Sequence, residues 1–321
     1  MPDSYDFAIF GSGALAALLA GLLAHDHGRR VIRIAEPASP QRLPRTIDVA
    51  LPLATRPEAW RLLRAAEAET LALFAATEAG DALMPATVKF VADRPDTQTA
   101  LAHMVHVALG YGRRGRDGLF ANVPRLVEEV SLAGSKVVQA DHAQLEDNRL
   151  IVAGEALKAD RIVLAGDIAV LDWLAEPPGL TVMPMTATLT APTRRLPATV
   201  MRYPDRGVTL LQRADLTVLA LVAGDHEAEA RLASTLPGPF PLHRRATSRF
   251  RRLLSEDGAP VVGPHGQFFI AAGFGDVGAF FAPVLARFLA GKGNDDENAW
   301  FTAHAPDADR SAIADFVEVR P

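Results

Sequence analysis

Short apolar runs and turns alternate at the start of the chain in a way that predicts a strand, a helix and a second strand. Phe7 to Phe10 is an apolar run of the kind found in buried parallel strands. Gly11-Ser12-Gly13 interrupts it, and Ala14 to Ala24 follows as an apolar helix of Ala and Leu. Val31 to Ala35 is a β-rich run, which Glu36 closes. The pattern indicates a βαβ unit with a glycine turn after its first strand.

The pattern continues as a second α/β segment up to residue 167. Helical periodicity predicts helices over Pro57–Ala76, Thr97–Leu109 and Asn122–Gly134. Strands are predicted over Thr87–Ala92 and Lys136–Ala140, in a hairpin around Asn148, and over Asp160–Ala165, which ends at Gly166. We expect this segment to lie beside the opening βαβ unit in one parallel sheet.

The character of the pattern changes between residues 181 and 223. Strand-like runs separated by turn residues cover Thr181–Met185, Ala187–Ala191, Thr199–Tyr203, Val208–Gln212 and Leu216–Val222. No long helical pattern intervenes, which predicts a mostly antiparallel sheet. Helices are predicted next, around Glu227–Ser234 and Leu242–Leu254, and the second of them carries a cluster of basic residues. Such a cluster on a helix is typical of a solvated face.

The last third returns to the first architecture. Asp257 to Pro264 is a turn with a short apolar centre, and Phe268–Ala272 predicts a buried strand. A second glycine-rich turn, Gly273 to Gly278, leads into an apolar helix over Ala279–Ala290 that ends at Gly291. A second helix N-terminus therefore follows directly after a strand and a glycine turn.

The first glycine turn has the chemistry of a dinucleotide site. Gly11 permits a tight turn, and Gly13 lets a pyrophosphate approach the backbone because no Cβ blocks it. Small residues at Ala16 and Ala17 allow the helix to pack closely on the strand. The helix N-terminus presents N–H groups and a positive dipole end to phosphates. Glu36, at the end of the second strand, suits an adenosine ribose. In a two-ended cofactor, the second helix N-terminus can stabilise negative charge on a reactive ring.

Composition narrows the function classes. The 321 residues carry a net charge of -5, which argues against nucleic-acid binding, and no cysteine, which excludes thiolate chemistry and disulfides. His103 and His106 lie three apart on a predicted helix without a third ligand nearby, so we expect no metal site. The acidic first residues do not resemble a signal peptide, and the apolar run Ala14–Ala24 is too short to span a membrane. We expect a cytoplasmic protein.

Three blocks in order resemble the D-amino-acid-oxidase-type FAD-dependent oxidoreductases, the family that includes glycine oxidase and sarcosine oxidase. They are Gly11-Ser12-Gly13 in its βαβ context, Ala159 to Gly166, and Asp257 to Gly263 continuing through Gly273, Gly278 and Pro283. The closing stretch Ala305 to Arg310 is similar to the end of the family's domain. The resemblance is weakest between residues 40 and 115, where the loop Arg45–Ala50 carries no glycine.

The resemblance implies an α/β fold with a Rossmann-like FAD-binding domain and an inserted α+β substrate domain on a mostly antiparallel sheet. The FAD domain would comprise residues 1–45, 116–178 and 257–321, and the substrate domain residues 46–115 and 179–256.

The resemblance also implies roles for individual residues. Those expected to bind FAD are Gly11, Ser12, Gly13, Ala14, Glu36, Val138, Gly166, Gly273, Gly275, Val277 and Gly278. Arg252, a few residues before Asp257, would pair with a substrate carboxylate, for which a planar guanidinium is suited. Arg252 precedes Leu253 where the family commonly has proline, so Arg249 and Arg251 stay open as alternatives.

The function implied is oxidation of a small-molecule amino acid or amine by hydride transfer to flavin N5, followed by hydrolysis of the imine. Two alternatives stay open: an FAD-containing dehydrogenase subunit working in a complex, and a degenerate, non-catalytic relative. An NAD(P)-dependent dehydrogenase is disfavoured because it leaves the block from Asp257 onward unexplained. Both a homo-oligomer and a partner subunit are compatible with this function.

Overall fold

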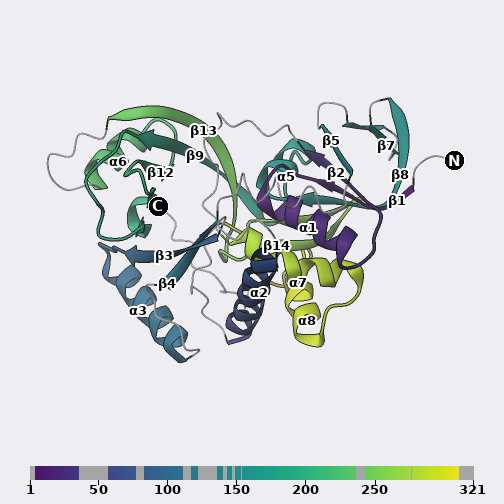
Figure 1. Cartoon of the computed structure of the whole chain (residues 1–321), viewed down its shortest axis with the longest axis horizontal. Coiled ribbons are helices and arrows are strands. Elements are labelled where there is room, and N and C mark those ends of the chain that lie inside the picture. Colours follow the sequence, from purple (N-terminus) through teal and green to yellow (C-terminus); the bar gives the residue numbers. More distant parts are fainter. Residues whose placement is uncertain are drawn as a thin grey trace.

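The chain folds around two β-sheets that lie side by side. The computed structural model describes residues 4–35, 57–76, 83–110, 117–121, 136–139, 143–146, 149–152, 154–235, 243–275 and 277–310. Figure 1 shows two long curved strands, β9 (Leu180–Thr190) and β13 (Arg244–Ser255), running from one sheet toward the other. No helix among these residues is long and apolar enough to cross a membrane.

The first sheet has a parallel core. Its strand order is β14-β15-β8-β1-β2-β5, and a hairpin, β6–β7, pairs with β8. The pairs β15–β8, β8–β1, β1–β2 and β2–β5 are parallel, so these strands end at one common edge. The bounds are β1 Ser4–Phe10, β2 Val31–Ala35, β5 Lys136–Gln139, β6 Ala143–Glu146, β7 Arg149–Val152, β8 Glu155–Ala165, β14 Val261–His265 and β15 Phe268–Ala272.

Helices cover both faces of this sheet. On one face the apolar core joins α1 (Ala14–His25), α2 (Pro57–Ala76), α7 (Gly278–Ala290) and α8 (Asp295–Ala303). Residues 14–23 of α1 are buried without exception, because a helix of Ala and Leu has no polar face to turn outward. On the other face lie α5 (Asp167–Trp173) and the side chain of Leu253 from β13.

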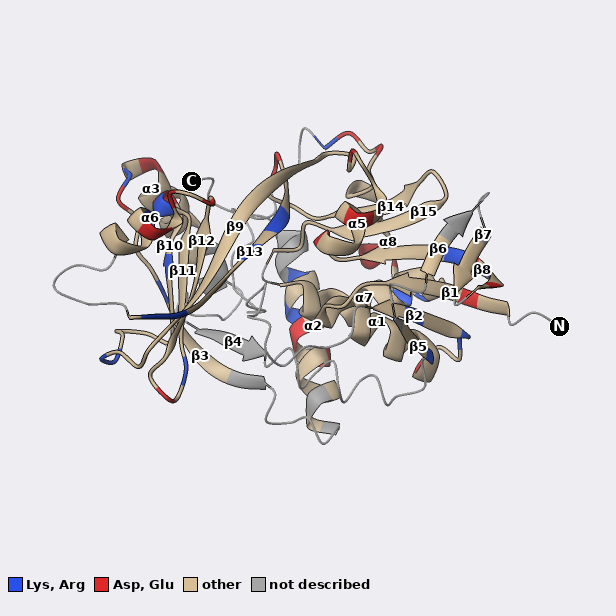
Figure 2. Cartoon of the chain, turned by 90° about the horizontal axis from the view of Figure 1, so that it is seen from above, with Lys and Arg blue, Asp and Glu red and all other residues tan. Residues whose placement is uncertain are grey.

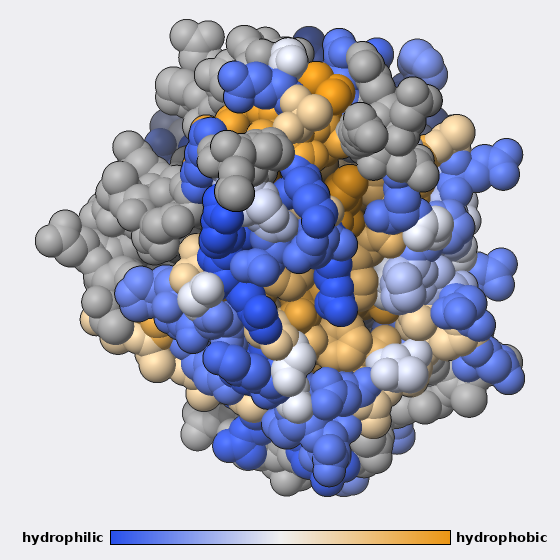
Figure 3. Space-filling model, turned by 90° about the vertical axis from the view of Figure 1, so that its right-hand side faces the viewer, coloured by the Kyte–Doolittle hydropathy of each residue, from blue (hydrophilic) through white to orange (hydrophobic). Residues whose placement is uncertain are grey.

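The N-termini of the parallel strands lie on the side of the molecule that carries the chain's N-terminus. Figure 3 shows this side, where apolar residues form a band between hydrophilic ones. The carboxyl ends of the strands point the other way, toward the second sheet, as Figure 1 shows for β1. Any site built from the ends of these strands therefore faces the second sheet.

The second sheet is mostly antiparallel. Its order is β13-β9-β12-β11-β10-β3-β4, and only the β10–β3 pair among these is parallel. The further bounds are β3 Leu83–Phe90, β4 Asp117–Ala121, β10 Val200–Tyr203, β11 Val208–Gln212 and β12 Val218–Ala223. Met104 of α3 (Pro95–Gly110) packs on one face, and Leu232 of α6 (Ala228–Thr235) on the other.

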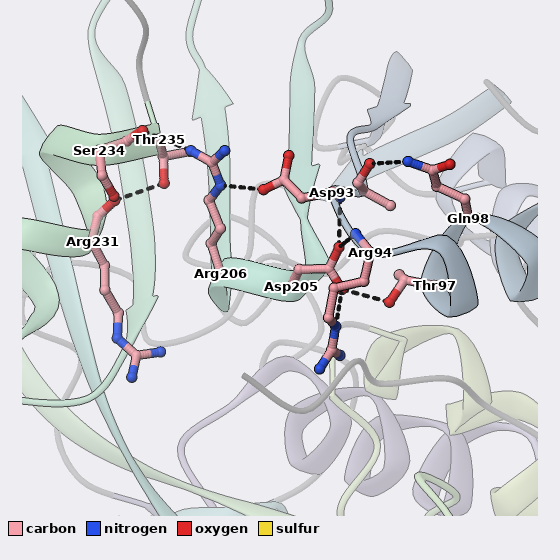
Figure 4. A network of polar contacts seen from close by, with 10 residues as sticks. Asp93, Arg94, Thr97, Gln98, Asp205, Arg206, Arg231, Ser234 and Thr235 are labelled. Carbon is pink, nitrogen blue, oxygen red and sulfur yellow. Dashed lines mark hydrogen bonds and ion pairs between the residues drawn. The ribbon is translucent and has the colours of Figure 1, made fainter.

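One carboxylate fastens α3 to the second sheet. Asp205, in the 3-10 turn η3 (Pro204–Arg206), accepts hydrogen bonds from the backbone N–H groups of Asp93 and Arg94 at 2.6 and 2.8 Å and from the Thr97 hydroxyl at 2.5 Å, as Figure 4 shows. Burial alone raises the pKa of Asp205, but the Thr97 and backbone hydrogen bonds outweigh it and lower the pKa.

The prediction of a helix over Leu242–Leu254 was wrong. Arg244 to Leu254 belong to β13, which pairs with β9 in an antiparallel register from Arg244 opposite Thr190 to Ser255 opposite Leu180. Arg and Leu favour helices locally, but pairing with β9 along the whole segment decides the structure. The predicted strands Thr181–Met185 and Ala187–Ala191 are one strand, β9. The predicted helix Asn122–Gly134 lies outside the described residues.

Two elements lie elsewhere than the expected domain division implies. β4 falls in the segment 116–178 but pairs with β3 in the second sheet. α2 falls in the segment 46–115 but packs against the first sheet's helices through Leu62, Leu63 and Ala66. The first sheet comprises β1, β2, β5 to β8, β14 and β15.

Candidate functional site

Three glycine turns meet at the common edge of the first sheet. Gly11 follows β1, Gly166 follows β8 and Gly273 follows β15, and these three strands are neighbours. All three glycines have positive φ, of 153°, 103° and 74°, a region that favours glycine. The Gly11 N–H donates to Ile34 O at 2.9 Å and the Gly166 N–H to Ala271 O at 2.8 Å, which ties each turn to the adjacent strand.

The turn at Gly11 is closely packed. A Cβ on Gly11 would lie 2.4 Å from the Ala165 carbonyl oxygen and 2.7 Å from the Ala16 Cβ. The close approach of α1 that the small residue Ala16 indicated is therefore present, and Ala16 is fully buried. Gly11 is required by the fold itself, because any side chain there would separate the ends of β1 and β8.

At Gly13, in the same turn, and at Gly166 the backbone borders open space instead. Apart from its chain neighbours, a Cβ on either would meet no atom of the described residues within 4 Å. Gly13 is the N-cap of α1 in an ordinary extended conformation, with φ of -85°, and no side chain caps the helix. Because a helix N-terminus presents its first N–H groups and a positive dipole end, this space suits a negatively charged group. The residues present therefore fit a phosphate-bearing ligand that approaches the backbone at Gly13.

The start of α7 lies beside the start of α1. Val277 is the N-cap of α7, and a Cβ on Gly278 would lie 3.4 Å from Phe274 Cβ and 3.8 Å from Leu15 Cβ. Gly275 precedes it with φ of 56°. The two helix N-termini that the sequence singled out thus lie close together at one edge of the sheet.

The side chain of Asp167, which sequence reasoning passed over, joins this edge to the second sheet. Its carboxylate accepts the Gly273 N–H at 2.9 Å through Oδ1 and the Leu253 N–H at 3.0 Å through Oδ2. Gly273 begins the turn before α7, and Leu253 lies in β13. The only local signal for this role is an acidic residue directly after a strand-ending glycine.

Arg252 lies at the same junction, next to Leu253. Figure 2 shows β13, with its basic residues, passing from the second sheet toward the first. Because side chains alternate along a strand, Arg252 points to the opposite face from Arg251 and Arg249. Arg249 and Arg251 are exposed, whereas the exposed fraction of Arg252 is 6%. The basic cluster expected on a helix is therefore divided by the strand, and one arginine is buried.

The other predicted site residues lie in different elements or outside the described residues. Val138 lies in β5 at the end of the sheet order, opposite Ile34, and is half-buried. Ser12 is exposed and Ala14 is buried at the start of α1. Glu36 and the loop Arg45–Ala50 lie outside the described residues. Among the residues that the structure describes, no group of three or more His, Asp or Glu side chains is arranged to hold a metal ion.

Solved structures share this fold. Glycine oxidase from Geobacillus kaustophilus superposes with a TM-score of 0.67 at 15% identity, over 91% of this chain and 95% of that one. L-amino acid deaminase from Proteus myxofaciens, in complex with anthranilate, gives a TM-score of 0.71 at 11% identity, over 94% and 93%. Iminodiacetate oxidase from Chelativorans sp. BNC1 gives 0.64 at 16% identity, over 89% and 94%.

Sequence comparison alone does not detect these similarities. No protein-family model and no curated protein sequence matches the chain. The resemblance that the sequence blocks indicated is confirmed at the level of the fold, because glycine oxidase is among the structures that this chain matches over most of its length. The chain has a mixed α/β fold of the kind found in these oxidases and deaminases.

Proposed function

We propose that this protein is an FAD-dependent oxidoreductase that oxidises an amino acid or amine. The observation that carries the proposal is the meeting of two helix N-termini, at Gly13 and Gly278, beside open space at Gly13 and Gly166. The fold shared with glycine oxidase and with L-amino acid deaminase supports the same chemistry.

The residues around Gly13 would hold the pyrophosphate and the adenosine half of FAD. Gly11, Ser12, Gly13 and Ala14 form the turn and the first helical N–H groups, and Gly166 borders the same edge. Val138 of β5 is proposed to contact the adenine through its backbone, and Glu36 to bind the ribose. Bound FAD supplies a ring that accepts a hydride at N5.

The turn from Gly273 to Gly278 would border that ring. Gly275 and Val277 lead into α7, whose N-terminus offers a positive dipole end. A fixed dipole of this kind stabilises negative charge that develops on a reduced ring. The backbone of the chain, and not a titrating side chain, would then perform the main electrostatic work.

Arg252 is proposed to bind the substrate carboxylate. Of the three arginines considered, it is the buried one, and its neighbour Leu253 is bonded to the edge where the turns meet. A guanidinium binds a carboxylate through two parallel hydrogen bonds, which orients the substrate as well as holding it. Arg249 and Arg251 are exposed on the opposite face of β13, which does not favour such a role.

The chain's part in the reaction is orientation and exclusion of water. Arg252 would fix one end of the substrate, and the apolar surroundings of β15 and α7 would limit water at the reacting C–H bond. Oxidation of a C–H bond next to nitrogen gives an imine, which water then hydrolyses. This scheme needs no side-chain general base.

We propose a division into two domains that corresponds to this function. A Rossmann-like FAD-binding domain would comprise residues 1–45, 116–178 and 257–321, and a substrate domain inserted into it residues 46–115 and 179–256. The parallel core and its common edge support the first unit, and the mostly antiparallel sheet supports the second. β4, α2 and, through Leu253, β13 pack across this division.

Anaerobic reduction tests the function. The purified protein, with FAD added, is mixed without oxygen with a panel of amino acids and secondary amines while the visible spectrum is followed. We expect the flavin absorbance to bleach with at least one compound. A protein that binds FAD but is bleached by none of them would contradict the proposed substrate class, and a protein that binds no FAD would contradict the proposal as a whole.

A further inference from the structure

We propose that Asp167 is a positioning residue that fixes the carboxylate-binding Arg252 relative to the turn from Gly273 to Gly278. The inference rests on the proposed function, because it assigns to Asp167 a role in the same site. It goes further in naming a residue that touches neither cofactor nor substrate and yet sets the distance between the two groups that hold them.

The geometry rests on the two oxygens of a single carboxylate. Oδ1 accepts the N–H of Gly273 at 2.9 Å, and Oδ2 accepts the N–H of Leu253 at 3.0 Å. Asp167 is itself the first residue of α5 and follows the strand-ending Gly166. One side chain therefore connects the ends of β8 and β15 with β13.

The hydrogen bond from Leu253 to Asp167 holds the edge strand of the second sheet. β13 is the end strand in the order of that sheet, and Leu253 is paired with Val182 of β9 on the other side. The carboxylate takes the N–H that a further strand would otherwise take. Because the same carboxylate also accepts the Gly273 N–H, this bond holds β13 against the first sheet at this point.

The two N–H groups that Asp167 binds lie next to the two parts of the site that the proposed reaction uses, Arg252 and the turn before α7. Leu253 follows Arg252 directly, and Gly273 is the first residue of the turn that leads to α7. In the proposed reaction, Arg252 sets the position of the substrate and the turn sets the position of the ring. Hydride transfer depends steeply on the separation of donor and acceptor, so an error of about 1 Å costs up to roughly 100-fold in rate.

Asp167→Asn tests this role with little change of shape. The amide offers one acceptor oxygen, while its NH₂ group faces the second N–H and cannot accept it. Asp167→Glu keeps the charge and both acceptor oxygens. Asp205→Asn is the matched control, because Asp205 likewise accepts several backbone N–H groups but lies at η3, away from the first sheet.

The probe is anthranilate, an aromatic amino carboxylate, titrated into the FAD-loaded protein while the visible flavin spectrum is recorded. We expect Asp167→Asn to keep its FAD content and to bind anthranilate at least about 10-fold more weakly than wild type. Asp167→Glu is expected to recover most of that affinity. Asp205→Asn is expected to match wild type in anthranilate affinity even where its thermal midpoint falls.

Two results would overturn the inference. One is an Asp167→Asn protein whose anthranilate affinity and spectral change equal those of wild type. The other is loss of FAD together with loss of anthranilate binding in both Asp167 variants, which would assign the residue to cofactor binding. A wild-type protein that takes up no FAD would instead contradict the proposed function, so the two failures are distinguishable.

Discussion

Gly11 and Ala165 approach so closely that a Cβ on Gly11 would lie 2.4 Å from the Ala165 carbonyl oxygen. The contact joins the turn after β1 to the end of β8. Two neighbouring parallel strands therefore end in register at one edge, with the N-terminus of α1 directly above them.

Gly11→Ala is expected to destabilise the fold itself. The substitution combines a φ of 153° with a clash against backbone, and each of these costs about 1–3 kcal/mol in the free energy of unfolding. The measurement is chemical denaturation without added cofactor. Gly154→Ala is the control, since Gly154 also has positive φ, of 81°, but faces open space, so only the conformational part of the cost applies. An equal loss of unfolding free energy in the two variants would show that the close contact of Gly11 with Ala165 adds nothing to the cost.

The substrate-binding role of Arg252 is tested by the same substitution at Arg252 and, as a control, at its neighbour Arg251. Arg252→Lys keeps the charge but loses the two parallel donors, so the apparent affinity for an amino acid substrate should fall by about 10-fold or more. Arg251→Lys lies on the exposed face of β13 and should leave the affinity unchanged. Flavin spectra during titration measure both. The carboxylate role of Arg252 does not hold if the two variants bind alike.

Asp257 and Arg310 make stability depend on pH in the acid range. Arg310 donates to the two Asp257 oxygens at 2.9 and 2.8 Å, and both side chains are largely buried. Burial alone raises the pKa of the Asp257 carboxyl, but hydrogen bonds from Arg310, Ala259 and Ser255 outweigh it and lower the pKa below its ordinary value. The folded state therefore gains stability above the unfolded-state pKa of about 3.9 and loses it as the pH falls toward the lowered value.

The measurement compares Asp257→Asn with wild type in thermal unfolding across pH. We expect the variant to be less stable at pH 7, by about 3 kcal/mol, because Arg310 is left without its ionic partner. The difference should be constant above about pH 5 and should shrink as the pH falls through the unfolded-state pKa. A difference that grows toward acid pH would contradict the sign of the pKa shift.

Arg287 holds three helices together. Its guanidinium binds Glu297 of α8 and Glu69 of α2, and hydrogen bonding to Glu297 raises the pKa of Arg287. The exposed fraction of the Glu297 side chain is only 4%, so Arg287→Met leaves a buried carboxylate unpaired and should cost about 3 kcal/mol of unfolding free energy. Arg231→Met, in a pair with the exposed Glu227, should change it by less than about 0.5 kcal/mol. Similar losses of unfolding free energy in both variants would show that the ion pair of Arg287 with the buried Glu297 stabilises the fold no more than an exposed pair does.

The parts of the fold that local pattern determines were predictable from sequence. β2, α2, β11 and β15 have the bounds that the apolar runs gave, and the helix expected from Ala279 begins one residue earlier, at Gly278. α8 was overlooked although it carries a local signal. Asn294 and Glu297 form a capping box, in which the Glu297 N–H donates to the Asn294 side chain at 2.9 Å.

The candidate site was predictable only in part, because its assembly depends on distant contacts. Glycine turns after strands are visible locally, and they do meet at one edge. The bonds of Asp167 join residues 86 and 106 positions apart, which no local pattern encodes. The strand β13 was mistaken for a helix for the same reason, since its conformation comes from pairing with β9.

The most direct test of the account is the amount of FAD that the purified protein retains, measured by its visible absorption, in wild type and in Gly13→Val. Gly13 has an ordinary backbone conformation, and in the part of the chain that the structure describes a Cβ there meets nothing within 4 Å beyond its chain neighbours, so the variant should fold and unfold like wild type without cofactor. We predict close to one flavin per chain in wild type and almost none in Gly13→Val. A colourless wild type that takes up no added FAD, or a Gly13→Val protein that retains full flavin, would contradict the proposed cofactor site.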